Sequence, residues 1–78
     1  MNNDVNNIAP GDLVWVPSEV TLYKFREEDG TLGDFFKTPQ PVNLLVSEVF
    51  DNALEVHYDG KKWEVKIRDV YPLIEVSQ

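Results

Sequence analysis

The chain has 78 residues, enough for one small domain, and it contains no cysteine, which excludes disulfides, thiolate metal sites and cysteine nucleophiles. Its 14 acidic and 7 basic residues give a net charge of −7. This charge opposes nonspecific binding to nucleic acid or to an anionic membrane, because such binding needs an excess of Lys and Arg. No apolar run in the sequence approaches the roughly 20 residues that span a bilayer.

Residues 1–9 are mostly polar and rich in asparagine. They lack the basic start and the apolar centre of a secretory signal peptide. We therefore predict a flexible polar tail over residues 1–9, a single domain over residues 10–78 and a cytoplasmic location for the protein.

Short runs of Val, Leu, Ile and aromatic residues, separated by prolines and glycines, are typical of small all-β domains. The segment Arg68-Asp69-Val70-Tyr71 is too short for an α-helix and fits one 3₁₀ turn before the last strand. The long loop after Val16 has two apolar segments on either side of an acidic turn, which indicates an irregular hairpin folded against the other strands. We predict five strands, at residues 12–16, 42–50, 53–58, 63–68 and 72–76.

In the first strand, alternation predicts Leu13 and Trp15 on one face and Val14 and Val16 on the other. Trp15 and Trp63 both lie on apolar alternation. We predict that both tryptophans are core residues, because a domain of this size needs large buried aromatic side chains to fold.

The third and fourth predicted strands form a hairpin in which apolar and polar residues alternate. A tight turn at Asp59-Gly60 would set Glu55 opposite Glu64, whereas a turn centred on Gly60-Lys61 sets Glu55 opposite Lys66. Opposite charges across strands stabilise a sheet by a few tenths of a kcal/mol and like charges destabilise it by a similar amount. We therefore predict the second register, which also gives the pairs Tyr58–Trp63, Val56–Val65 and His57–Glu64.

This order of elements resembles an SH3-like barrel. The shared features are a first strand "GDLVWV", a long loop, a meander of three strands with a "DG" hairpin, a one-turn 3₁₀ element and a terminal "VYPL". The resemblance covers about residues 10–76. It implies an all-β, five-stranded SH3-like barrel with a long first loop of the RT type and a 3₁₀ turn before the last strand. Several SH3-like groups share these features, including the C-terminal domains of retroelement integrases, and the chain also resembles small uncharacterised SH3-like proteins of marine tailed phages.

The chain departs from the family in the residues that bind ligands. Proline-rich peptides dock on an ALYDY-type segment, a tryptophan that starts a strand in mid-barrel and a Pro-x-x-Tyr sequence. Here the loop reads "EVTLYKFREEDG", no tryptophan starts the strand at 53–58, and "YPLIEV" reverses the order of Pro and Tyr. We therefore predict no proline-rich peptide site. DNA binding of the integrase type disagrees with the net charge, so the resemblance implies a fold and not a function.

No motif for catalysis, metal binding or cofactor binding is present. His57 is the only histidine, and no nucleophile accompanies it, so we interpret it as a surface residue of a cross-strand pair. The acidic turn Glu27-Glu28-Asp29-Gly30 lacks the alternate ligands and the closing glutamate of a calcium loop. Gly30 and Gly33 are not followed by the Lys-Ser/Thr of a phosphate-binding loop. We predict a non-enzymatic protein without metal or cofactor.

The aromatic and acidic loop is the leading candidate for a binding site. Phe35 and Phe36 are adjacent, so in an extended chain they point to opposite faces and one of them is expected to be exposed. Exposed aromatic residues anchor protein interfaces, and an acidic rim favours a basic or amphipathic partner. The same loop would alternatively serve only as a lid over the core. The predicted partner-binding residues are Tyr23, Phe25, Glu27, Glu28, Asp29, Phe35 and Phe36.

Three other functions are compatible with the sequence. A local basic strip would bind nucleic acid, with Tyr58 or Tyr71 stacking on bases; its residues are Lys61, Lys62, Lys66 and Arg68. Scattered carboxylates would mimic nucleic acid, as some phage inhibitors do. The last predicted strand, at 72–76, would join a neighbour in a larger assembly. A phage accessory protein would act in the host cytoplasm.

Overall fold

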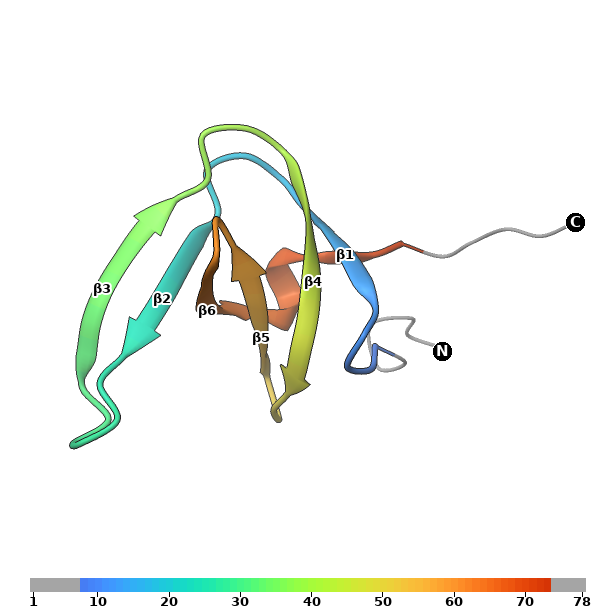
Figure 1. Ribbon diagram of the computed structural model, residues 1–78. Helices are drawn as coiled ribbons and strands as arrows, with labels where there is room; N and C mark the ends of the chain where they lie inside the picture. Colours follow the sequence, from blue (N-terminus) through green and yellow to red (C-terminus); the bar gives the residue numbers. More distant parts are fainter. Residues whose placement is uncertain (1–7, 74–78) are drawn as a thin grey trace, which may run out of the picture.

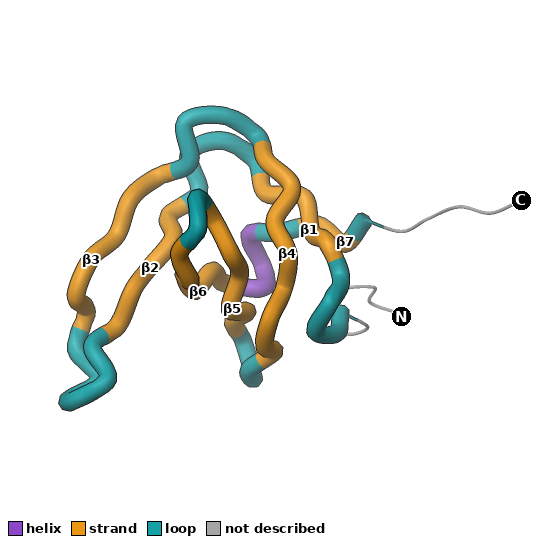
Figure 2. The backbone as a smooth tube through the Cα atoms, viewed as in Figure 1, coloured by secondary structure: helices purple, strands orange, loops and turns teal. Residues whose placement is uncertain are grey.

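The computed structural model describes residues 8–73. Seven strands form one antiparallel sheet in the spatial order β3-β2-β6-β5-β4-β1-β7 (Figure 1; β7 is labelled in Figure 2). The strands are β1 (Leu13–Val16), β2 (Thr21–Phe25), β3 (Leu32–Lys37), β4 (Val42–Val49), β5 (Ala53–Tyr58), β6 (Lys61–Lys66) and β7 (Tyr71–Pro72), and a 3₁₀ turn, η2 (Ile67–Asp69), precedes β7. The all-β class and the 3₁₀ turn before the last strand are thus confirmed. None of the helical structure in residues 8–73 has the length and apolar character of a membrane-crossing helix.

The predicted five-stranded SH3-like barrel is wrong, because the sheet is open. Within residues 8–73, β3 pairs with β2 alone and β7 pairs with β1 alone, so the two ends of the sheet do not meet. The hairpin expected in the long first loop forms two regular strands, β2 and β3, and extends away from the rest of the sheet (Figure 1). One bridge pair, Tyr23 with Glu64, joins β2 to β6. At the other end β7 has 2 residues, and both pair with β1.

The predicted strand positions agree closely with the observed ones at the centre of the sheet. The strands predicted at 12–16, 42–50 and 53–58 match β1, β4 and β5 to within one residue, and the strand predicted at 63–68 lies two residues earlier, as β6. Residues 74–76 of the last predicted strand lie outside the described part of the chain. Ile8 belongs to the predicted tail, yet it is buried in the core.

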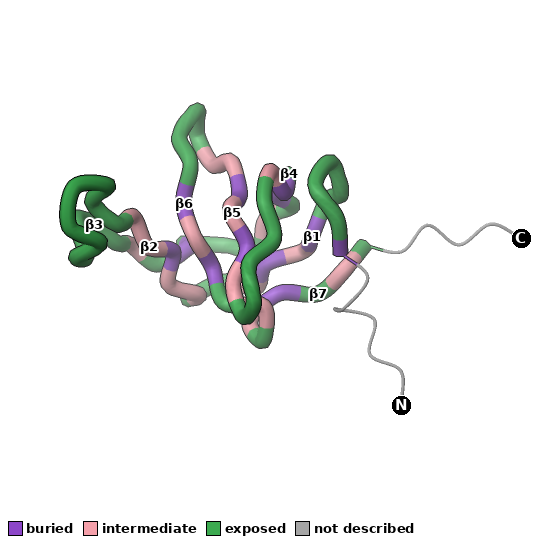
Figure 3. The backbone as a smooth tube through the Cα atoms, turned by 90° about the horizontal axis from the view of Figure 1, so that it is seen from below, coloured by how far each residue is buried: buried purple, intermediate pink, exposed green. Residues whose placement is uncertain are grey.

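The core lies on the inner face of the curved sheet. The chain between β6 and β7 must cross this face, because β6 and β7 are separated by three strands, and η2 lies in this crossing (Figure 2). Buried positions alternate with more exposed ones along β1, β5 and β6, as expected of strands with one covered face, whereas β3 is mostly exposed (Figure 3). The buried apolar residues are Ile8, Val14, Val16, Leu22, Leu44, Val46, Leu54, Val56, Trp63, Val65 and Val70.

The two tryptophans differ in burial. Trp63 is 8% exposed, which confirms its prediction as a core residue. The prediction for Trp15 is wrong: it is half-buried on the opposite, outer face, where its ring lies 5.5 Å from that of Tyr71. The predicted alternation along β1 is confirmed, since Val14 and Val16 are the buried pair. Alternation separates the two faces of a strand but does not say which face meets the core.

The predicted register of the β5–β6 hairpin is also wrong. Val56 lies opposite Trp63, and Glu55 lies opposite Glu64. The turn is Asp59-Gly60, whose φ angles are 53° and 77°. Two-residue turns with positive φ at both positions match the twist of the strands, and Asp-Gly is among the sequences that favour them most. This turn preference outweighs a repulsion between carboxylates of a few tenths of a kcal/mol.

A buried hydroxyl group fixes the root of the β2–β3 hairpin. Thr38 is 1% exposed, and its Oγ1 donates a hydrogen bond to the carbonyl oxygen of Pro17 at 2.7 Å. Thr38 Oγ1 also accepts a hydrogen bond from the Val20 amide at 3.1 Å. These bonds tie the chain that enters β2 to the chain that leaves β3, so the hairpin starts from a fixed place beside the core.

Candidate functional site

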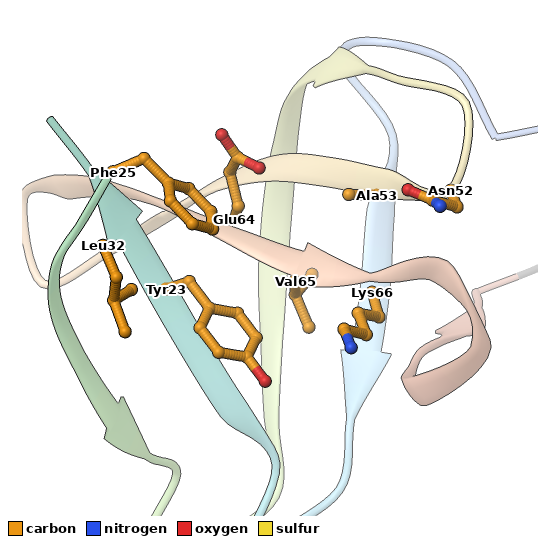
Figure 4. Close-up of a pocket in the computed structure, with 8 residues that line it drawn as sticks. All are labelled: Tyr23, Phe25, Leu32, Asn52, Ala53, Glu64, Val65 and Lys66. Carbon is orange, nitrogen blue, oxygen red and sulfur yellow. The ribbon is translucent and has the colours of Figure 1, made fainter. Parts of the chain in front are cut away.

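A cavity of about 300 Å³ opens where β2 diverges from β6 (Figure 4). Residues from β2, β3, β6 and the start of β5 line it, so strands distant in sequence meet there. The side chains that matter most are Tyr23, Phe25, Leu32, Ala53, Glu64 and Lys66. We call the side of the sheet opposite the core the outer face. Along β2, Tyr23 and Phe25 belong to this face, because the alternating Leu22 is fully buried in the core.

The hairpin contributes an apolar strip to this face, made of Tyr23, Phe25, Leu32 and Phe35. The strip consists of two cross-strand pairs, Tyr23 with Phe35 and Phe25 with Leu32. The rings of Tyr23 and Phe25 are stacked, with centroids 6.1 Å apart and planes 20° from parallel. Phe25, Leu32 and Phe35 are 41%, 45% and 58% exposed. The strip is therefore a continuous apolar surface beside the cavity.

The facing wall of the cavity carries a carboxyl group. Glu64 on β6 lies opposite Tyr23 on one side and Glu55 on the other. Burial raises the pKa of the Glu64 carboxyl above its ordinary value, and the negative charge of Glu55 raises that pKa further. Within residues 8–73 no Lys, Arg or His nitrogen lies within 4.0 Å of Glu64, the one ion pair of this part being Arg68 with Asp69.

The acidic wall continues across the sheet. Glu55 accepts a hydrogen bond of 2.7 Å from the Ser47 hydroxyl and is itself paired with Glu48 on β4. Three carboxyl groups thus stand on three neighbouring strands. The side chain of Lys66 provides a positive charge at the rim, with Nζ 5.9 Å from the centroid of the Tyr23 ring.

The structure separates the predicted partner-binding residues into three groups. Tyr23 and Phe25 line the cavity, and Phe35 lies beside them. Phe36 faces the other way and packs on the rings of Trp63 and Tyr58, with centroids 4.8 Å and 5.1 Å away. The expectation that one of the two adjacent phenylalanines is exposed is confirmed.

The acidic members of the predicted site lie at the tip of the hairpin. Glu27, Glu28 and Asp29 are exposed residues of the turn between β2 and β3. Asp29 Oδ1 accepts hydrogen bonds from the amide and the hydroxyl of Thr31 at 3.0 and 2.7 Å. These bonds lower the pKa of the Asp29 carboxyl, the amide contributing most. Asp29 therefore closes the turn, while the two glutamates face solvent beyond the cavity.

The alternative basic strip is divided between places. Lys61 and Lys62 are adjacent on β6, so they point to opposite faces. Lys62 and Lys66 share the outer face, with Glu64 between them. Arg68 lies in η2, where its Nε is 3.9 Å from the carboxylate of Asp69. The four cations do not form one continuous surface.

Two further observations concern the chemistry of the site. His57 is paired with Lys62 and Leu45 instead of Glu64, which follows from the observed register. Among residues 8–73, no three His, Asp or Glu side chains are grouped in a way that could hold a metal ion. The sequence prediction missed Leu32, Ala53 and Glu64 as members of the site and assigned Lys66 to the alternative basic strip. The signal for Glu64 was the Asp59-Gly60 turn, which places two glutamates opposite each other.

Searches of protein-family models, curated proteins and solved structures find no match for this chain.

Proposed function

We propose that this chain is a non-enzymatic interaction module that binds a protein partner through the apolar strip and the adjoining cavity. One observation carries the proposal: large apolar side chains, three of them 41–58% exposed, lie in or beside a cavity whose wall holds a carboxyl group with no Lys, Arg or His nitrogen of residues 8–73 within 4.0 Å. Aromatic side chains in a desolvated pocket supply most of the binding energy in protein interfaces. The strip offers such anchors on the paired strands β2 and β3.

The aromatic residues of the hairpin lie on both of its faces, which supports a role as an interface in addition to a role in covering the core. Phe36 is the residue that covers the core, through its contacts with Trp63 and Tyr58. Phe25 and Phe35 do not cover the core, because they lie on the outer face. Their exposure leaves apolar surface that a partner would bury.

The charge of the chain favours a basic or amphipathic partner. The net charge is −7, and Glu27 and Glu28 stand at the exposed end of the hairpin. Complementary charge around an interface speeds the encounter with the correct partner and repels acidic competitors. A role for the protein in phage infection stays a prediction.

The experiment is affinity capture from a lysate of the source cells with three proteins. The test variant is the double substitution Phe25→Ala and Phe35→Ala, and the control is Leu45→Ala, since Leu45 is 43% exposed on another part of the sheet. A partner retained by the wild type and the control should be lost from the double variant. Calorimetry with the purified partner should then show affinity weakened about tenfold or more, as expected for removal of two anchors. Equal retention by all three proteins contradicts the proposal.

A further inference from the structure

The cavity holds a feature that an apolar partner does not explain: within residues 8–73 no Lys, Arg or His nitrogen lies within 4.0 Å of the half-buried Glu64 carboxyl group, although Lys62 and Lys66 flank Glu64 on the same face. The residue opposite it on β5 is Glu55, a second carboxyl group. Like charges in this arrangement destabilise a sheet. Natural sequences break such local rules mainly at functional sites. A ligand that brings positive charge to Glu64 would remove the conflict.

The wall opposite Glu64 is aromatic. Tyr23 is the cross-strand neighbour of Glu64 on β2, which sets their Cβ atoms about 5 Å apart. Its ring already lies near a cation, because Nζ of Lys66 is 5.9 Å from the ring centroid. Tyr23 and Glu64 both line the cavity, and Figure 4 shows the Glu64 carboxyl group pointing away from the Tyr23 ring, so a ligand shared by the two requires the Glu64 side chain to turn towards the ring.

We propose that the cavity receives an arginine side chain of the protein partner, with the guanidinium plane against the Tyr23 ring and its N–H groups bonded to Glu64. This inference rests on the proposed function and names the chemistry of the anchor. Arginine fits better than lysine, because its guanidinium is planar and weakly hydrated and can stack on a ring while donating two parallel hydrogen bonds to a carboxylate. A volume of about 300 Å³ is at the low end of small-molecule pockets and suits one long side chain.

Lys66 competes with the arginine from within the chain. Its ammonium group lies near the ring that the guanidinium needs, and two positive charges at one ring face repel each other. Because Lys66 is exposed, its flexible side chain can turn towards solvent when the arginine enters. A neutral residue at this position should therefore strengthen binding, which a site for an apolar anchor alone would not predict.

The test is a titration followed by the amide NMR spectrum of the full chain. The probe is the peptide acetyl-Gly-Ser-Arg-Ser-Gly-amide, compared with two peptides that carry lysine or citrulline in place of the arginine. Citrulline keeps the shape of arginine and lacks the charge. The arginine peptide should shift the amide signals of Tyr23, Ala53 and Glu64, and the citrulline peptide should bind about tenfold more weakly or not at all, as expected for loss of a charge-assisted hydrogen bond.

Two variants, each with one matched control, distinguish a local contact from the long-range attraction of an acidic protein for any cation. Glu64→Gln should weaken the arginine peptide about fivefold or more, whereas Glu48→Gln removes the same charge outside the cavity and should change affinity less than about twofold. Lys66→Gln should strengthen binding roughly two- to fivefold, whereas Lys62→Gln, on the same strand and face, should have less effect. Equal binding of the lysine or citrulline peptide, signal changes elsewhere on the sheet, or an unchanged affinity in Glu64→Gln would each overturn the inference.

The result is separable from the proposed function. If partner capture depends on Phe25 and Phe35 but the arginine peptide does not bind, the interaction surface stands and the arginine anchor fails. If the arginine peptide binds at Glu64 but the double phenylalanine variant keeps its partner, the cavity is a cation site and the apolar strip is not the interface.

Discussion

Replacing Glu64 with glutamine should make the protein more stable at neutral pH. Glutamine keeps the size and shape of glutamate and removes the charge that faces Glu55 across the hairpin. The pKa of the Glu64 carboxyl is raised by burial and by Glu55, so folding disfavours the charged form of this group relative to the unfolded chain. The substitution removes the charge at this position at every pH.

The expected gain follows from the geometry of the pair. Opposite residues in an antiparallel ladder have Cβ atoms about 5 Å apart, and two unit charges at that distance repel by about 0.8 kcal/mol in bulk water. At 0.1 M salt the Debye length is about 10 Å, and screening reduces this repulsion to about 0.5 kcal/mol. At 1 M salt the Debye length is about 3 Å, and the repulsion falls to about 0.1–0.2 kcal/mol. For a domain of this size, about 0.5 kcal/mol raises the melting temperature by roughly 2–4 °C.

The dependence on pH has a definite sign. Above the ordinary value of 4.5, the folded state keeps the Glu64 proton longer than the unfolded state does. Protein stability therefore falls as the pH rises from 4.5 through the raised pKa. Glu64→Gln lacks this contribution. The stability difference between variant and wild type should be largest at neutral pH and should shrink as the pH is lowered towards 4.5.

Urea unfolding at pH 7 and at mildly acidic pH, each at low and high salt, measures all three effects. Glu28→Gln is the control, because it makes the same chemical change at the exposed tip of the hairpin. A loss of stability in Glu64→Gln, or a gain that does not decrease between 0.1 and 1 M salt, would refute the electrostatic explanation.

Two further predictions concern the backbone. Gly60→Ala should destabilise the protein by about 1 kcal/mol in urea unfolding. The φ angle of Gly60 is +77° and an added Cβ would meet no heavy atom within 4 Å, so backbone strain alone causes the loss. An unchanged urea midpoint would contradict this prediction. Asp34→Ala should increase the concentration-dependent self-association measured by analytical ultracentrifugation. Asp34 Oδ1 accepts a 2.8 Å hydrogen bond from the Phe35 amide on the edge strand β3. Without this carboxylate, the Phe35 amide is free to pair with another chain. Asp51→Ala removes the same charge at an exposed turn, and equal behaviour of the two variants would contradict the role of Asp34.

The sequence was sufficient to predict the strands that depend on local alternation. β5 was predicted without error, because its apolar residues recur at every second position between two turn signals. The closure of the sheet was not predictable in this way. It depends on whether β3 and β7, at opposite ends of the described sheet, meet each other, and neither strand carries a local signal for that contact.

The candidate site shows the same division between local and distant information. The aromatic residues of β2 and β3 were predicted, because a short segment rich in aromatics stands out in any small domain. Glu64 was not predicted, because its place opposite Tyr23 results from a single bridge between strands about 40 residues apart. The register prediction also hid Glu64, since it balanced charges and ignored the stronger preference of Asp59-Gly60 for a two-residue turn.

The unfavourable register and the proposed arginine site bear on each other through one variant. If the repulsion between Glu55 and Glu64 persists only because the Asp-Gly turn dictates the register, Glu64→Gln should raise stability and leave the affinity for the arginine peptide unchanged. If the carboxyl group of Glu64 is retained to bind a ligand, Glu64→Gln should raise stability and weaken the binding of the arginine peptide. Stability and function commonly conflict in this way at sites where charge is held ready for a partner. The two measurements on Glu64→Gln therefore distinguish a by-product of turn geometry from a binding site.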